Sequence, residues 1–284
     1  MIKSVYFDRN VFDYIRRRRI TDGDLQVLRA IIRLGEFSIL LSVTLLEEAL
    51  ILLKTSSDIA KEEWQLLASL TRGSKVIKHH QELLRDDILS YAKGWPTPSP
   101  FTAEFDDLIK YLNPDEPDLA GRLAVVAEVE QAKNEVQSNL QVAKNHDSTY
   151  FGTLPKGSRP DFKKYYCNHA LRVASDFAQK VGVLAECKAK GLEGLLQIKS
   201  VQLCVGAHLS LGYAQTREGQ AVSPGDWHDM QHAVLASAAD AFVTQDKKLS
   251  KNLNRLGIKD LEVINLQTLL QRIFEHYHAQ PTFA

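Results

Sequence analysis

Short apolar runs alternate with amphipathic stretches at the N-terminal end of the chain. Residues 3–8 are apolar, β-branched and aromatic before they end in Asp8, and residues 36–41 form a second run of this kind. Such runs predict buried strands, and the spacing of apolar residues between and after them predicts helices. The expected helices cover residues 10–19, 22–34, 43–54 and 58–70, with a further short strand near residues 76–79.

The same alternation returns at the C-terminal end. Residues 226–239 have helical spacing, DAFVT at 240–244 predicts a strand, and KKLSKNLNRLG predicts a helix that stops at Gly257. A last strand, LEVINL, precedes a closing helix. Strands that alternate with helices favour parallel pairing through right-handed crossovers. We therefore expect an α/β fold with a parallel sheet between helical layers.

The middle of the chain has a different pattern. From residue 81 to 215 the apolar residues recur at helical spacing, and GWPTPSP, NPDEPD and GTLPKGSRPD interrupt them with turn-forming residues. We predict a core formed by residues 1–75 and 221–284, with residues 76–220 as a large, mostly helical insertion.

Composition narrows the class of protein only slightly. The 284 residues are 44% hydrophobic and 25% charged, and 35 basic residues balance 35 acidic ones. This balance neither indicates nor excludes nucleic acid, because local patches matter more than totals. The three cysteines form no CxxC pair, which suggests reduced thiols. With no apolar run near ~20 residues and no leader pattern, we expect a cytoplasmic protein without membrane contact.

Four acidic residues stand at expected strand ends or in the first turns of helices: Asp8, Glu47, Asp229 and Asp246. In a parallel sheet these positions meet at one edge, where ligands bind. Clustered carboxylates repel one another, and a hard cation such as Mg²⁺ or Mn²⁺ removes that cost. Metal-assisted attack of water on a phosphodiester is the chemistry that needs such a cluster.

Three segments carry a family resemblance. FDRNVF, SVTLLEEAL and DMQHAVLASAADAFVTQDKKL resemble the PIN-domain nucleases, over roughly the first 55 and last 65 residues. The resemblance implies a parallel α/β/α sandwich and Mg²⁺- or Mn²⁺-dependent cleavage of single-stranded RNA. It also implies metal-ligand and catalytic roles for the four acids, with Asn10 and Thr244 as polar supports.

Several other residues near these motifs are also candidates for the site. Glu48 adjoins Glu47, and the family spacing favours Glu47. Arg9 stands where the family usually has a small or hydroxylic residue, so it would touch RNA phosphate or weaken metal binding. Asp226 either supports the site or caps its helix. Asp240 is expected to support the site from behind the metal ligands.

Basic residues near the motifs are candidate contacts to nucleic acid. Arg16 opens a run of four arginines, which cannot all face one ligand from a helix. Lys248 and Lys251 follow Asp246 at helical spacing and would contact phosphate beside it. Solvated helix surfaces explain both groups equally well.

The histidines leave two further alternatives open. His228 and His232 are four residues apart, as in zinc sites of the HExxH kind. The doublets His146-Asp147 and His228-Asp229 are typical of helical HD-type phosphohydrolases, but the expected strands conflict with an all-helical fold.

The favoured function is therefore a metal-dependent endoribonuclease. The alternative is an inactive PIN-like module that binds RNA or protein. A DNA nuclease and a toxin with an antitoxin are less favoured hypotheses. Expected partners are single-stranded or structured RNA, a protein bound through the insertion, and a second copy of the chain.

Overall fold

A computed structural model describes residues 2–54, 56–71, 75–102, 161–218, 225–258 and 260–279, with isolated positions between 121 and 138. Five strands form one parallel sheet in the order β3-β2-β1-β4-β5. The strands are β1 Ser4–Phe7, β2 Ser38–Ser42, β3 Val76–Ile77, β4 Ala241–Val243 and β5 Glu262–Ile264. The prediction of an α/β fold with a parallel sheet is confirmed.

The N-terminal helices follow the predicted pattern closely. They are α1 Arg9–Arg16, α2 Asp22–Arg33, α3 Val43–Ile51 and α4 Ser57–Leu70, with the short η1 Leu52–Lys54 after α3. α1 stops three residues before its predicted end, because Arg18 takes a left-handed conformation with φ 53°. Arg17, Arg18 and Arg19 therefore do not continue the helix.

The remaining helices come from the middle and the C-terminal end of the chain. Those of the middle are α5 His80–Lys93, α8 Phe162–Val181, α9 Leu184–Lys190, η3 Leu192–Gln197 and α10 Lys199–Arg217. Those of the C-terminal end are α11 Gly225–Leu235, η4 Ala236–Ala238, α12 Lys247–Asn254 and α13 Leu266–Ala279.

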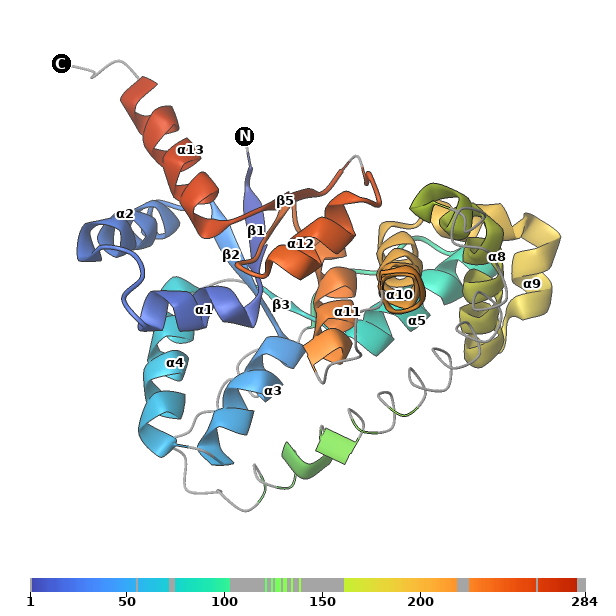
Figure 1. Ribbon diagram of the computed structural model, residues 1–284, viewed down its shortest axis with the longest axis horizontal. Helices are drawn as coiled ribbons and strands as arrows, with labels where there is room; N and C mark the ends of the chain where they lie inside the picture. The colour runs from blue at the N-terminus through green and yellow to red at the C-terminus, as the bar shows by residue number, and fades with distance from the viewer. Residues whose placement is uncertain are drawn as a thin grey trace.

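Helices cover both faces of the sheet (Figure 1). Successive side chains of a strand point to opposite faces. Val5 and Phe7 therefore pack in a core with α1–α4 and α13, while Tyr6 packs in a second core with α10, α11 and α12. Burial on both faces explains why these strands read as continuous apolar runs.

A third core joins the helices of the middle region. Ile88 of α5, Ala174 of α8, Cys187 of α9 and Val205 of α10 pack together in it. The division into a core and a helical insertion over residues 76–220 stays a prediction, and the structure differs from it at residue 76. Val76 and Ile77 pair with β2, so the sheet continues one strand past the predicted boundary. Most of residues 103–160, with His146, lie outside the described residues.

Within the described residues, no helix has both the length and the apolar character needed to cross a membrane.

Candidate active site

The site begins at Asp8, directly after β1. β1 and β4 are adjacent and parallel, so the residues that follow them leave the sheet at the same edge. Asp8 is 5% exposed and is the N-cap of α1. Its Oδ2 accepts hydrogen bonds from Asn10 Nδ2 at 2.6 Å and from the Thr244 hydroxyl at 2.8 Å. The two residues predicted as polar supports thus hold this carboxylate from α1 and from the end of β4.

The same polar residues order the loop after β4. Asn10 Oδ1 accepts from the backbone N–H of Gln245 at 2.8 Å, and Thr244 Oγ1 accepts from that of Asp246 at 3.0 Å. Asp246 in turn caps α12, accepting from the backbone N–H groups of Lys248 and Leu249 at 2.7 and 3.0 Å. The position of Asp246 therefore depends on the bonds that orient Asp8.

Asp229 reaches the same region from α11. Burial first, and then the charges of Asp8 and Asp246, raise the pKa of Asp229 to about 7. Burial also raises the pKa of Asp8. Three of the four predicted acids, from three separate segments of the chain, therefore lie in one region, where the charges of Asp8 and Asp246 act on Asp229.

The glutamate that joins them is Glu48, whereas the sequence favoured Glu47. Glu48 is 4% exposed, and its two oxygens lie 2.8 Å from His228 Nδ1 and 3.0 Å from His232 Nε2. Glu47 instead faces His79 at 3.9 Å. Successive helical residues point about 100° apart, so the two carboxylates have different partners. Glu48 lies one helical turn after Thr44, which is buried. The four-residue spacing between Thr44 and Glu48 is visible in the sequence.

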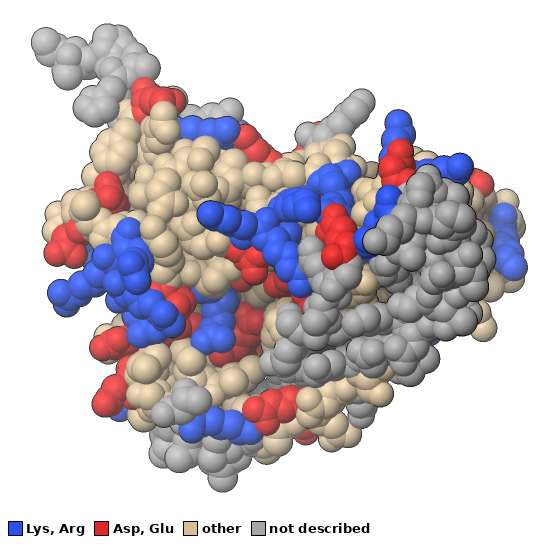
Figure 2. Space-filling model, in the orientation of Figure 1, with Lys and Arg blue, Asp and Glu red and all other residues tan. Residues whose placement is uncertain are grey.

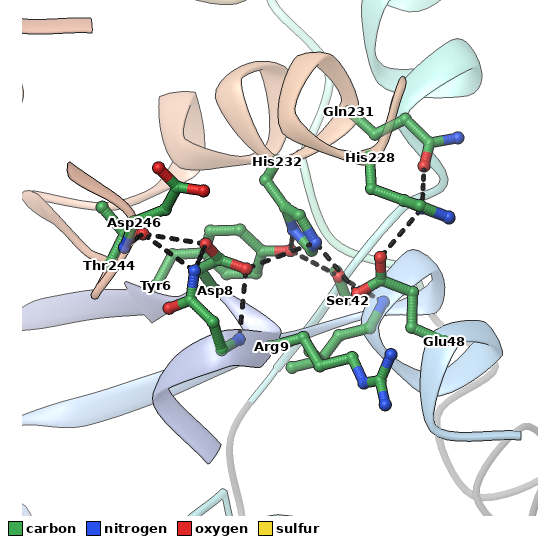
Figure 3. Close-up of polar contacts among 12 residues, drawn as sticks. Tyr6, Asp8, Arg9, Ser42, Glu48, His228, Gln231, His232, Thr244 and Asp246 are labelled. Atoms are coloured by element: carbon green, nitrogen blue, oxygen red, sulfur yellow. Dashed lines mark hydrogen bonds and ion pairs between the residues drawn. The ribbon is translucent and has the colours of Figure 1, made fainter. Parts of the chain in front are cut away.

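His232 occupies the centre of the site (Figure 3), a position that the sequence analysis did not assign to it. Its Nε2 lies 3.0 Å from Glu48 and 3.8 Å from Asp8, and its Nδ1 lies 2.7 Å from the Tyr6 hydroxyl. Burial lowers the pKa of His232, but the charge and hydrogen bond of Glu48, with the charges of Asp8 and Asp229, together outweigh burial and raise it to about 9. His232 follows Asp229 by one helical turn, which could have pointed to it.

A charged His232 sets the direction of a buried hydrogen-bond chain. The imidazolium has two N–H donors, so Nε2 donates to Glu48 and Nδ1 donates to the Tyr6 oxygen. The Tyr6 hydroxyl then donates to Ser42 Oγ at 2.9 Å. Burial raises the pKa of Glu48, but His232 and His228 outweigh it and hold that pKa well below its usual value.

The lysines after Asp246 have carboxylate partners. Lys248 Nζ lies 2.5 Å from Oδ1 of Asp226, whose side chain is buried. Asp226 lies in the first turn of α11 and adds to the repulsion felt by Asp229. Lys251 is 65% exposed and lies 3.5 Å from Glu218. Lys248 thus belongs to the border of the acidic group, and Lys251 to the open surface.

The arginines of α1 meet an acid from α4. Arg9 Nε donates to Oε1 of the buried Glu63 at 3.0 Å. Arg16 bonds to Asp13 and lies 3.8 Å from the other Glu63 oxygen. Arg16, predicted to contact nucleic acid, is therefore part of an ion-pair network within the protein.

Asp240 does not support the site. It accepts hydrogen bonds from the backbone N–H groups of Lys3 and Ser4, both at 2.9 Å, at the start of β1. Asp240 precedes β4, and in a parallel sheet the residue before a strand lies at the opposite edge from the residue after it. The predicted role of Asp240 is corrected accordingly.

The acids fit a hard cation only in part. Among the described residues, no three His, Cys, Asp or Glu side chains are arranged as ready metal ligands. The carboxylates of Asp8, Asp229 and Asp246 nevertheless have the donor chemistry that Mg²⁺ and Mn²⁺ prefer, and the charges of Asp8 and Asp246 add to burial in raising the pKa of Asp229. Glu48 is already engaged by histidines. His228 and His232 each direct a ring nitrogen to Glu48, and the described residues add no group of three ligands that would form a zinc site with them.

No protein-family model matches the sequence, and neither the curated proteins nor the solved structures contain a match.

Proposed function

We propose that the protein is a PIN-like, metal-dependent endoribonuclease that hydrolyses phosphodiester bonds of single-stranded RNA. The observation that carries the proposal is the grouping of Asp8, Asp229 and Asp246 at the carboxyl edge of a parallel sheet. Burial, and then the charges of Asp8 and Asp246, raise the pKa of Asp229 to about 7. Ligand sites of open α/β sheets lie at this edge, and the resemblance of the three sequence segments to PIN nucleases supports the same assignment.

Each acid has a distinct role in this proposal. Asp8, Asp229 and Asp246 would hold Mg²⁺ or Mn²⁺, which when bound lowers the pKa of water and neutralises charge that develops on the phosphate. Asn10 and Thr244 hold the Asp8 carboxylate in one orientation before substrate arrives. His232 contributes a fixed positive charge, which keeps Glu48 ionised and offsets part of the negative charge around Asp8.

The surface around the acids suits a polyanion. Figure 2 shows a recess between α1, α3 and α12 in which Asp and Glu side chains lie beside Lys and Arg side chains, with further Lys and Arg side chains over α12. Lys248 and Lys251 belong to α12. A basic border attracts the RNA backbone, and the acids at the centre take the metal.

One observation favours a second candidate, an inactive module that binds RNA or protein. Both oxygens of Glu48 are held by histidines, and Asp246 uses Oδ1 to cap α12. If these bonds persist in the working protein, too few carboxylate oxygens remain free for catalysis.

The deciding experiment measures cleavage of single-stranded RNA and DNA with Mn²⁺, with Mg²⁺ and with chelator. Asp8→Asn should lower the rate by more than about 100-fold, because it removes a charge from the reacting centre. Asp240→Asn is the matched control, an acid at the opposite sheet edge, and should cleave like the wild type.

Thermal unfolding separates the two candidates. Mn²⁺ at 100 times its Kd should stabilise the wild type by about 2.7 kcal/mol and leave Asp8→Asn unchanged. A wild type that neither cleaves nor gains stability from millimolar Mn²⁺ would overturn the nuclease and favour the binding module.

A further inference from the structure

We infer that Arg9, held by the buried Glu63, is a fixed phosphate-binding group of the site, and that Glu63 acts as the residue that positions it. The kinetic test of this role rests on the proposed nuclease function. RNA binding tests the role of Arg9 separately.

Two elements fix the arginine. Arg9 is the first residue of α1 and directly follows Asp8. Its Nε donates to Glu63 Oε1 at 3.0 Å, and Glu63 belongs to α4, which packs against α1. The Glu63 side chain is 1% exposed and the Arg9 side chain is 30% exposed. A buried carboxylate therefore holds the inner edge of a guanidinium that reaches solvent.

The arginine points into the site. Figure 3 shows the Arg9 side chain extending from α1 toward α3, the helix that carries Glu48. Burial lowers the pKa of Arg9, but Glu63 and then Glu48 outweigh it, so the guanidinium is within electrostatic reach of the buried glutamate. The bond to Glu63 uses Nε–H, and a guanidinium has four further N–H donors on its terminal nitrogens.

Burying the Glu63 carboxylate costs free energy, so a gain in stability alone does not explain its ion pair with Arg9. Burial raises the pKa of Glu63, while Arg9 and Arg16 act in the opposite direction. Burying a carboxylate carries a large desolvation penalty, whereas ion pairs of exposed arginines contribute little. A buried anchor is well suited to hold one guanidinium in a single orientation, which a solvated arginine does not have.

A phosphodiester is the ligand that this geometry favours. The acids of the site repel an approaching phosphate, and the Arg9 guanidinium, which is within reach of Glu48, would offset that repulsion. The planar fork of arginine matches two phosphate oxygens, and a lysine at this position would lack that match. Arg9 directly follows Asp8, and its guanidinium extends toward α3, so a phosphate bound to it would lie on the Glu48 side of the site.

Binding is tested first, on the full chain in chelator, where no cleavage occurs. The anisotropy of a fluorescein-labelled single-stranded RNA would be measured for the wild type, Arg9→Ala and Arg17→Ala at several salt concentrations. Arg17 is the matched control, a 62% exposed arginine at the far end of α1 that pairs with Asp13. Arg9→Ala should bind roughly ten-fold more weakly, and its salt slope should be smaller by about 0.7. Arg17→Ala should resemble the wild type.

Kinetics with Mn²⁺ then test the positioning role. Glu63→Gln keeps the charge of Arg9 but loosens its anchor, so kcat should fall more than KM rises. Arg9→Lys should recover most of the binding and little of kcat, because lysine cannot form the fork. A merely structural Glu63 would lower the melting temperature without this split. If Glu63→Gln does not fold, the comparison of Arg9→Ala, Arg9→Lys and Arg17→Ala still decides the inference.

The outcomes separate this inference from the proposed function. Equal affinity and equal salt slope for Arg9→Ala and Arg17→Ala would overturn the role of Arg9, even if the wild type cleaves RNA. RNA binding that depends on Arg9 without any metal-dependent cleavage would support the phosphate site and overturn the nuclease. A wild type that neither binds nor cleaves RNA would overturn both.

Discussion

At the scale of single residues, the buried glutamate is the most informative position. Glu47 and Glu48 are adjacent in the sequence and chemically identical, yet their surroundings differ completely. Glu48 lies between His228 and His232, which hold its pKa below the usual value. Burial first, and then Glu48, raise the pKa of Glu47 to about 7. One residue of helical rotation thus separates an ion-paired carboxylate from a repelled one.

This difference predicts that the same substitution has effects of very different size at the two positions. Glu48→Gln leaves His232 buried without its counter-charge and should lower the free energy of unfolding by roughly 3–5 kcal/mol. Glu47→Gln removes a carboxylate whose ionisation is already disfavoured and should change that free energy little. Urea denaturation at about pH 7.5 measures both. Equal losses in the two variants would contradict the assignment of Glu48 to the site.

At the scale of elements, the junction between β2 and α3 links helix formation to the site. Ser42 ends β2 and caps α3, accepting from the backbone N–H of Leu45 at 3.0 Å. The same oxygen takes part in the bond to the Tyr6 hydroxyl. Ser56 caps α4 in a comparable way, accepting from the backbone N–H of Ile59 at 3.3 Å. The two serines therefore allow capping to be separated from site geometry.

Replacing each serine by alanine should show this separation. Loss of either cap should cost about 1 kcal/mol of unfolding free energy. Ser42→Ala should cost about 1–3 kcal/mol more, because the buried Tyr6 hydroxyl loses its acceptor. Only Ser42→Ala should also lower RNA cleavage, since α3 carries Glu48. Equal stability and equal activity in the two variants would show that the Tyr6 chain does not support the site.

At the scale of the whole molecule, the two ends of the chain meet at the centre of the sheet. β1 pairs with β4, and the backbone N–H of Asp8 donates to Val243 at 3.0 Å. The contacts of His232 with Tyr6 and Glu48 add a polar connection between α11 and the N-terminal elements. Unfolding of either end should therefore expose the site.

The charge of His232 predicts a dependence of global stability on pH. Folding raises its pKa from the ordinary 6.5 to about 9. A raised histidine pKa stabilises the fold fully below pH 6.5, and this contribution is lost as the pH rises through about 9. The melting temperature of the wild type should fall more steeply between about pH 6.5 and 9 than that of His232→Gln. Parallel curves for the two proteins would contradict the charged state of His232.

The linear pattern of residues determined much of the fold and part of the site. Alternating apolar runs and amphipathic stretches predicted the parallel strands, because burial on both faces of a sheet requires continuous apolar residues. Strand ends predicted that Asp8, Asp229 and Asp246 approach one another, with Asn10 and Thr244 beside them, because parallel strands end at one edge.

Only the tertiary structure decided which side chains face the site. Helical rotation selected Glu48 over Glu47, the direction of β4 placed Asp240 at the opposite edge, and the packing of α1 on α4 brought Glu63 to Arg9. Packing also raised the pKa of His232, because it buried the carboxylate of Glu48, from another helix, against the histidine. These outcomes depend on contacts between residues far apart in the chain, which local patterns do not encode.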